Sequence, residues 1–190
     1  MMSNYLESAE KQFLYYKKLG ENTFVQLTDE QLFWRQSSDQ NSISIIVNHL
    51  WGNMLSRWTD FLNSDGEKEW RERDLEFEEV IKTRQDLLDK WEEGWACVLD
   101  AIDSIQEEHY DQLVYIRNMG HTIPEAINRQ LAHYAYHVGQ IVYLARQLKG
   151  LEWESLSIPK GESKAYNAEK FAKEKRKGDF TGEFLDKDKK

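Results

Sequence analysis

The sequence predicts an all-α protein, a four-helix bundle of four long helices with a C-terminal extension. Apolar residues recur at steps of three and four positions over stretches of about 20 to 30 residues, which is the spacing of one helix face. No alternating strand pattern interrupts these stretches, and only two prolines occur in 190 residues, so long segments can remain helical. Amphipathic helices of this length bury their apolar faces by packing together as a bundle.

The first two helices are predicted from an apolar stripe and a capping signal. The stripe along the first long helix consists of Leu6, Ala9, Phe13, Tyr16, Gly20, Phe24 and Leu27. Thr28 and Gln31 then have the spacing of a capping box, which predicts a short helix in LTDEQLFWRQ. After the polar loop SSDQNS, Ser42 or Ser44 can cap a second long helix, which we expect to run to about Leu62.

The third long helix is predicted from about Glu76 to Ile105. The residues that keep its inner face are Phe77, Val80, Arg84, Leu87, Trp91, Trp95, Val98, Ile102 and Ile105. The connector before it contains an Asp65-Gly66 turn. We interpret the many carboxylates of EKEWRERDLEFEEV as a solvated face.

The last long helix is predicted from signals at both ends. Residues 113–117 are expected to form a short extended segment before it. Thr122 and Glu125 form a second capping-box pattern, and Pro124 falls in the first turn, where its missing N–H costs little. Gly150 is a natural stop for this helix.

The chain after the last long helix differs from the rest in its charge. We expect residues 1–158 to form the bundle and residues 159–190 to form a basic C-terminal tail that is partly helical or disordered, with a short helix over residues 166–177. The formal net charge is −9, yet residues 160–190 hold ten Lys or Arg against seven Asp or Glu. Since that segment carries +3 of the total of −9, the preceding residues carry about −12.

Charge and hydropathy disfavour two classes of partner. An acidic body argues against nucleic acid, because binding to phosphates needs a concentrated basic face. The most apolar run, ISIIVNHLWGNML, is too short and too polar to span a bilayer, so we expect no membrane partner. MMSNYLESAEKQF lacks the features of a signal peptide, and the single cysteine, Cys97, excludes an internal disulfide, so we expect a cytoplasmic location.

Three histidines fall on helix faces that should point into the bundle. On the last helix, His133 and His137 are four positions apart, so their Cβ atoms lie about 5–6 Å apart on one face. On the second long helix, His49 occupies the inward stripe beside Gly52, which leaves one side of that core layer open. Three imidazoles with an open fourth position can bind zinc, and imidazole suits nickel, iron or copper equally. The alternative is that all three are hydrogen-bonded core residues.

No further catalytic motif accompanies the histidines. HYAYH lacks the glutamate of a zincin, and the sequence has neither a phosphate-cradling glycine loop nor G-x-S-x-G. Asn53, Gln130 and Gln140 lie at helical spacing from the histidines and could orient the imidazoles or a substrate, with ordinary polar contacts as the alternative. Arg57 could bind a substrate carboxylate, or it could pin the connector through a salt bridge.

Several motifs resemble one known family, the DinB superfamily of bacterial four-helix proteins. NHLWGN on the second long helix and HYAYHVGQ on the last one resemble its metal triad, in which helix two gives one histidine and helix four gives H-x-x-x-H, often followed by Gly-Gln. LTDEQLFWRQ…NSISIIVNHL is similar to the family's approach to the first histidine. The connector RWTDFLNSDGEKEWRERDLEFE is similar to one branch, long catalogued as a domain of unknown function. The resemblance covers about residues 5–160.

The resemblance implies a DinB-like up-down-down-up bundle, commonly a homodimer, with one divalent ion (zinc or nickel) per chain on His49, His133 and His137. DinB/YfiT-like relatives include thiol-dependent S-transferases and isomerases that use bacillithiol, mycothiol or glutathione. The resemblance therefore implies a metal-dependent thiol S-transferase whose partners are a small-molecule thiol and an electrophile. Because the connector belongs to one branch, the pocket rim and the substrate are expected to differ. The alternative is a non-catalytic metal-binding or purely structural homodimeric bundle.

Overall fold

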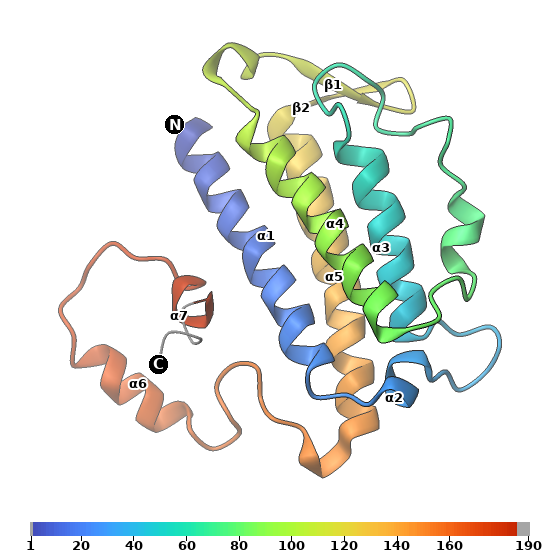
Figure 1. Cartoon of the computed structure of the whole chain (residues 1–190). Coiled ribbons are helices and arrows are strands. Elements are labelled where there is room, and N and C mark those ends of the chain that lie inside the picture. Colours follow the sequence, from blue (N-terminus) through green and yellow to red (C-terminus); the bar gives the residue numbers. More distant parts are fainter. Residues whose placement is uncertain (1, 186–190) are drawn as a thin grey trace.

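The computed structural model describes residues 2–185 and is mostly helical. Seven α-helices and one two-stranded antiparallel sheet lie within that part of the chain. Four long helices lie side by side around one apolar core (Figure 1): α1 (Met2–Phe24), α3 (Ile43–Trp58), α4 (Arg84–Asp103) and α5 (Ile123–Lys149). No helix among the described residues combines the length and the apolar character that crossing a membrane requires.

Contacts between helix ends give the directions of the long helices. Tyr5 near the start of α1 donates a 3.1 Å hydrogen bond to the carbonyl of Pro124 at the start of α5, so these two helices run the same way. Arg84 at the start of α4 donates to the Leu27 carbonyl just beyond the end of α1 at 2.6 Å, so α4 runs the opposite way. Figure 1 shows that α3 runs in the same direction as α4.

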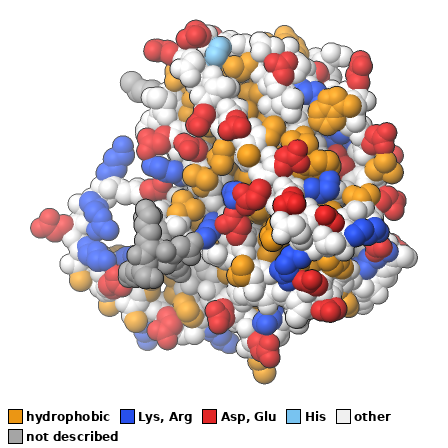
Figure 2. Space-filling view, in the orientation of Figure 1, with side chains coloured by type: hydrophobic (Ala, Val, Ile, Leu, Met, Phe, Trp, Pro, Cys, Tyr) orange, Lys and Arg blue, Asp and Glu red, His pale blue; other side chains and the backbone are white. Residues whose placement is uncertain are grey.

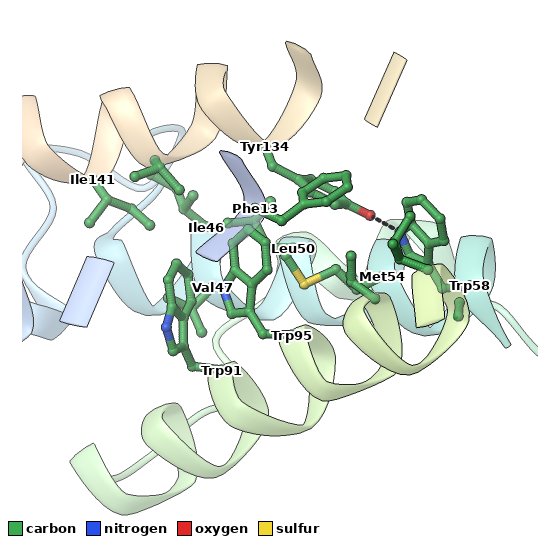
Figure 3. Close-up of a cluster of buried hydrophobic side chains, with 14 of the residues drawn as sticks. Phe13, Ile46, Val47, Leu50, Met54, Trp58, Trp91, Trp95, Tyr134 and Ile141 are labelled. Atoms are coloured by element: carbon green, nitrogen blue, oxygen red, sulfur yellow. Dashed lines mark hydrogen bonds between the residues drawn. The ribbon is translucent and has the colours of Figure 1, made fainter. Parts of the chain in front are cut away.

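The core between the long helices is rich in aromatic side chains (Figure 3). Trp58 Nε1 donates a 2.9 Å hydrogen bond to Tyr134 Oη, which joins α3 to α5. Large aromatic rings bury more apolar area than other side chains and therefore dominate the energy of such a core. The almost completely buried aromatic residues are Phe13, Phe24, Trp58, Trp91, Trp95 and Tyr134.

The structure confirms several predicted helix ends. Thr28 and Gln31 form a capping box at the start of α2 (Asp29–Phe33), and Thr122 and Glu125 form another at the start of α5. The last long helix stops before Gly150, whose φ of 61° suits a glycine. Two short 3₁₀ turns follow α4 and α5, namely η2 (Glu107–His109) and η3 (Gly150–Glu152).

The second long helix is shorter than predicted. The Ser42 side chain caps α3 by accepting from the Ile45 N–H, but the helix ends at Trp58 and does not reach Leu62. Asp60 has a φ of 49°, which is incompatible with a right-handed helix, so the chain turns away at this point. This early end lets the following residues fold back as a connector along the outside of α3 (Figure 1).

The third long helix starts later than predicted. α4 begins at Arg84, not at Glu76, and Thr83 provides its N-terminal cap. The residues upstream form a separate 3₁₀ turn, η1 (Arg73–Phe77), which packs against α3. Within this turn the Glu76 side chain is buried. Val80, which follows the turn and which the prediction placed in the core, is 48% exposed. Burial of Glu76 against α3 holds this segment away from the axis of α4.

A small hairpin precedes α5 and is the one departure from an all-helical chain in the described residues. β1 (Leu113–Ile116) pairs with β2 (Met119–Thr122), so the predicted extended segment is confirmed while its partner strand was not predicted. Arg117 and Asn118 at the turn have φ values of 54° and 59°. Both of their N–H groups donate 2.8 Å hydrogen bonds to the Asp65 carboxylate, which ties the connector to the hairpin.

Two short helices lie beyond α5. α6 (Ser163–Phe171) begins and ends earlier than the helix predicted over residues 166–177. α7 (Gly182–Leu185) packs against α1, and the Phe180 ring just before it lies 5.5 Å from the Tyr15 ring. The C-terminal segment therefore returns to the body of the molecule and lies beside α1 (Figure 1).

The C-terminal segment also differs from the helices in charge. Figure 2 shows Lys and Arg side chains along this segment and many Asp and Glu side chains across the neighbouring surface. Lys11 of α1 lies 3.5 Å from an oxygen of Asp179, so an ion pair joins the two parts. The division into residues 1–158 and 159–190 stays a prediction, and residues 186–190 of the predicted tail lie outside the described residues.

Candidate metal centre

Three histidines from two helices meet in one cluster. His49 on α3 and His133 and His137 on α5 each bring one ring nitrogen within 4.8 Å of the other two. The Nε2 atom of His133 lies 3.3 Å from that of His49 and 3.1 Å from that of His137. Within residues 2–185, no further His, Cys, Asp or Glu joins this group. The structure thus brings together the three residues that the sequence singled out.

Two of these rings are held from behind by hydrogen-bond acceptors. His49 Nδ1 lies 2.8 Å from Glu76 Oε2, and His137 Nδ1 lies 2.9 Å from Gln140 Oε1. Because a carboxylate and an amide oxygen can only accept, each Nδ1 carries the proton and each Nε2 presents a lone pair to the cluster. An imidazole whose second nitrogen donates to such an acceptor is the usual form of a metal-binding histidine.

The spacing of the nitrogens fits a divalent ion. Two nitrogens bound tetrahedrally to one zinc ion at the usual bond length lie about 3.3 Å apart, which is close to the distances from His133 Nε2 to the other two Nε2 atoms. In the absence of a cation, His133 Nε2 has one proton to offer two facing lone pairs, so one lone pair lacks a full hydrogen bond. A cation would engage all three nitrogens, so the residues present fit a three-histidine metal site.

Burial keeps two of the rings in the form that binds metals. Desolvation, followed by the neighbouring charges of His137 and His49, lowers the pKa of His133 to about 3. Desolvation and the proximity of His49 lower the pKa of His137 to about 4, against the hydrogen bond that it donates to Gln140, which raises the pKa. Because a metal binds the neutral imidazole, both side chains are ready to act as ligands at neutral pH.

The carboxylate that holds His49 comes from the connector. Glu76 is 5% exposed, so the interpretation of EKEWRERDLEFEEV as a solvated face is wrong for this residue, whereas most other carboxylates of the stretch are exposed. Its two oxygens also accept hydrogen bonds from Arg71, Nε at 2.7 Å and Nη2 at 3.0 Å. Burial by itself raises the pKa of Glu76, but the hydrogen bonds from His49 and Arg71 outweigh that effect and lower it. Glu76 is therefore ionised at neutral pH.

Gly52 on α3 makes room for this carboxylate. A Cβ atom at Gly52 would lie 2.6 Å from Glu76 Oε1 and 2.8 Å from its Cδ. The sequence suggested that Gly52 leaves one side of the core layer open, but Glu76 occupies that side. The glycine is thus needed because the connector approaches α3 closely at this point.

A chain of ion pairs ties the connector to α3 and to the hairpin. One oxygen of Glu67 accepts from Arg57 Nη2 at 3.0 Å, and the same oxygen lies 3.1 Å from nitrogens of both Arg71 and Arg117. Arg57 also donates to the carbonyl of Gly66. The sequence left two roles open for Arg57, and the structure contains the salt bridge that attaches the connector to α3.

The amide side chains singled out by the sequence have different surroundings. Gln140 bonds a histidine, whereas Asn53 and Gln130 make no such bond among the described residues. Asn53 Oδ1 accepts a 3.2 Å hydrogen bond from Tyr134 Oη, so it links the site to the aromatic core. Gln130 is buried, and its Oε1 has no hydrogen-bond partner within residues 2–185.

A pocket of about 410 Å³ opens onto the histidines. Its volume lies within the range of small-molecule sites, about 300–1,000 Å³. The Phe77 ring stacks on the His49 ring with centroids 4.6 Å apart and covers one face of it. The lining residues are His49, Asn53, Arg57, Arg71, Arg73, Phe77, Arg117, Arg129, Gln130, His133, Tyr136 and His137.

Several residues of this site were missed by sequence reasoning. Glu76 and Arg71 have no helical spacing to any histidine, so periodicity could not connect them to the site. Arg117 and Arg129 come from the hairpin turn and from the first third of α5. The one signal was the branch-specific connector, which led us to expect an unusual pocket rim, and Arg71, Arg73 and Phe77 of the connector do line the pocket.

Comparison with known proteins places the chain in one family. Residues 1–162 match the family model described as Protein of unknown function (DUF1572). No curated protein and no solved structure matches the chain. Since the family match spans most of the 190 residues, including all three histidines and the connector, the chain belongs to the DUF1572 family.

Proposed function

We propose that this protein is a divalent-metal-dependent enzyme acting on a small molecule bound beside His49, His133 and His137. The observation that carries the proposal is the convergence of three imidazole nitrogens, without a fourth protein ligand in the described chain, on a pocket of about 410 Å³. Structural zinc sites are closed by four protein ligands, whereas catalytic sites keep one position open. This arrangement supports a catalytic role for one zinc or nickel ion per chain.

We propose further that the chain is of the DinB type. The order of the ligands supports this, since one histidine comes from α3 and the H-x-x-x-H pair from α5. The helix directions also support this proposal, since α1 and α5 run one way and α3 and α4 the other (Figure 1), as an up-down-down-up bundle requires. The DUF1572 family would then be a branch of the DinB superfamily.

The side chains around the histidines have separate roles in this proposal. Glu76 and Gln140 accept the Nδ1 protons of His49 and His137 and thereby aim both Nε2 atoms at one point. Arg71 keeps Glu76 ionised and fixed, so that the orientation of His49 is held by two partners in series. A divalent ion on the three nitrogens would favour the thiolate form of a thiol substrate at neutral pH.

The reaction we propose is S-transfer from a low-molecular-weight thiol such as bacillithiol. The thiol loses its proton to solvent, its sulfur forms a bond to an electrophilic carbon of the second substrate, and the leaving group departs with the bonding electron pair. The pocket lining contains no Asp or Glu side chain that could accept that proton as a general base. A divalent ion held by the three histidines would lower the pKa of a thiol bound to it, so the reaction would not need such a base.

Metal content is the first test. The purified chain is incubated with zinc and nickel, dialysed and analysed by mass spectrometry, and we expect about one ion per chain. His133→Ala should lose the ion, because it removes the nitrogen that lies between the other two. His109→Ala is the matched control, since His109 lies outside the cluster and the variant should keep the ion. Equal metal content in the parent and in His133→Ala would refute the metal site.

Activity separates the enzyme from its alternative. The metal-loaded chain is assayed with bacillithiol, mycothiol and glutathione against a panel of electrophiles, with His133→Ala as the negative control. Turnover that depends on His133 supports the S-transferase. Tight metal binding without turnover with any thiol would instead favour a non-catalytic metal-binding bundle. The predicted homodimer stays a prediction, and sedimentation velocity of the loaded chain tests it.

A further inference from the structure

Arginine is concentrated around the histidine pocket. The chain has nine arginines, and five of them line this pocket: Arg57, Arg71, Arg73, Arg117 and Arg129. They come from α3, the connector, the hairpin turn and α5, so the tertiary fold gathers them from four places. The lining contains no Asp or Glu, although the chain as a whole carries a net charge of −9. A local excess of positive charge in a chain whose net charge is negative needs an explanation.

Two of these arginines are used to build the site. Arg71 and Arg57 are nearly fully buried and bond Glu67, and Arg71 also bonds Glu76. Buried guanidinium groups paired in this way hold the connector in place. Their charges still contribute to the electrostatic potential of the pocket.

The other three guanidinium groups are available at the rim. Arg117 pairs with Glu67 at 3.1 Å, but its side chain is 59% exposed. Arg73 and Arg129 are exposed, and neither has a carboxylate partner within residues 2–185; Arg73 lies over the Phe77 ring at 5.3 Å. Arg73 and Arg129 are therefore free to bind a ligand, and the exposed Arg117 can bind one while it stays beside Glu67.

The charges do not balance within the site. Five arginines face two carboxylates, Glu67 and Glu76, which leaves three positive charges in excess before any metal is counted. A recessed site focuses such a field, because its walls have a low dielectric constant. The pocket therefore attracts anions strongly.

Two buried polar atoms at the pocket also lack partners. Arg57 Nε and Gln130 Oε1 are buried without a hydrogen bond among the described residues, and both residues line the pocket. An unsatisfied buried donor or acceptor destabilises the fold. Both side chains therefore have unused hydrogen-bonding capacity beside the pocket.

We propose that the pocket binds a small molecule with at least two oxyanion groups, carboxylate or phosphate, held by Arg73, Arg117 and Arg129. Guanidinium matches both groups through paired hydrogen bonds, which an ammonium group cannot make. A pocket of about 410 Å³ admits a metabolite and not a folded partner. The idea that its reactive end lies over His49, His133 and His137 rests on the proposed function, whereas the anion site itself does not.

Titration calorimetry of the zinc-loaded chain with succinate and, separately, with inorganic phosphate tests the proposal. Arg73→Gln/Arg129→Gln changes two exposed residues, so it should fold normally and bind the preferred anion at least about tenfold more weakly. Arg146→Gln/Arg176→Gln is the matched control, because it removes the same charge from exposed arginines outside the pocket lining. The control should bind as the parent does, and binding should weaken as salt concentration rises.

The outcomes are distinct. A loss confined to phosphate identifies a phosphorylated substrate, and a loss confined to succinate identifies a dicarboxylate. Equal affinity in the pocket variant and the control variant, or no binding of either anion by the parent, overturns the proposal. Metal content is measured on every sample and on His133→Ala. If anion binding depends on the arginines and persists without metal, the anion site stands even if the proposed function fails. If the chain retains metal but anion binding does not depend on the arginines, the metal site stands and the anion site is refuted.

Discussion

The aromatic core and the histidine pocket share two helices, α3 and α5, but different forces hold the two regions together. In the core, Trp95 and Tyr134 are completely buried, and their rings pack against each other with centroids 5.6 Å apart. In the pocket, His49 and Arg71 are buried nearly as deeply, but each makes specific polar contacts with Glu76. The hydrogen bond from Trp58 to Tyr134 (Figure 3) and the one from Tyr134 to Asn53 mark the border between the two regions.

This difference predicts how each region responds to substitution. Packing energy increases with buried apolar area, so loss of a core side chain destabilises the whole fold. A buried ionic network adds little net stability, because desolvation offsets the attraction, but it holds its members in one geometry. We therefore expect core substitutions to lower the free energy of unfolding and pocket substitutions to lower metal affinity more than stability.

The largest loss of stability is expected in the core. Trp95→Ala removes a fully buried ring and leaves a cavity, so the free energy of unfolding should fall by about 3–5 kcal/mol. Trp95→Phe should lose less, since it keeps a ring and removes an Nε1–H that has no partner among the described residues. Urea unfolding followed by circular dichroism measures both. Trp70→Ala, at a 57% exposed position, is the control and should stay within about 0.5 kcal/mol.

The orientation of His49 is the next target. Glu76→Gln keeps the size of the side chain but removes the charge that holds the Nδ1 proton, so zinc affinity should fall about 10- to 100-fold. Gly52→Ala should have a similar effect, because its Cβ atom would displace the Glu76 carboxylate. Competition with a chromophoric zinc chelator measures both affinities.

A matched glycine makes this test specific. Gly139 lies on α5 two residues beyond His137, and a Cβ atom there meets no heavy atom within 4 Å. Gly139→Ala should therefore bind zinc as the parent does and should be slightly more stable, since alanine favours a helix by about 1 kcal/mol. If Gly52→Ala and Gly139→Ala bind zinc equally well, the position of the Glu76 carboxylate does not depend on the space that Gly52 leaves beside α3.

The pocket should also make the metal-free protein sensitive to pH. The pKa values of His133 and His137 in the folded chain, about 3 and about 4, lie below the ordinary value of 6.5. Between pH 6.5 and about 4 the unfolded chain therefore binds more protons, and stability falls as the pH is lowered, with an upper limit of about 1.4 kcal/mol per pH unit for each ring. Partial exposure of His133 reduces this slope.

Urea unfolding of the metal-free chain at pH 7, 6 and 5 measures this slope. His133→Ala/His137→Ala should flatten the dependence, whereas Trp95→Phe should keep the slope and shift the whole curve down. Parallel curves for the parent and the double histidine variant would show that the two rings titrate alike in the folded and unfolded chains.

The smallest effect is expected at the start of α5, a helix that carries both regions. Thr122→Ala removes the side chain that accepts from the Glu125 N–H and should lower the free energy of unfolding by about 1 kcal/mol. Thr122→Ser keeps the hydroxyl group and should restore most of this loss. Zinc affinity should not change in either variant. If Thr122→Ala binds zinc more weakly, the geometry of the pocket depends on the N-terminal cap of α5 as well as on the polar network around the histidines.

Local signals in the sequence predicted helix caps well and one buried face only in part. Capping boxes depend on residues three positions apart, so Thr28 and Thr122 were readable without tertiary information. The stripe predicted for the last helix placed His133 inside, yet His133 is half-buried and Tyr134 is the fully buried neighbour. The buried face of a helix is wide enough to include neighbouring positions in the sequence. The side chains of the opposing helices decide which of these positions is most deeply buried.

The start of α4 shows why periodicity alone was insufficient. The spacing from Phe77 through Val80 to Arg84 continues a helical repeat, and nothing local in the chain opposes a helix there. Instead, α4 starts only at Arg84 and the preceding turn η1 stays separate from it, because the Glu76 carboxylate bonds His49 and Arg71 beside Gly52. Hydrogen bonds between groups so far apart in sequence outweigh the helical preference of a short segment.

By itself, the sequence determined the helical class, the caps of α2, α3 and α5, and the three histidines, because helical periodicity relates residues that are close along the chain. Only the tertiary structure decided what surrounds those histidines. Glu76 is 27 positions from His49, and the five arginines of the pocket come from four separate segments. No local pattern links such residues; they meet because the connector and the hairpin fold back over α3 and α5, and that meeting determines the charge and shape of the pocket.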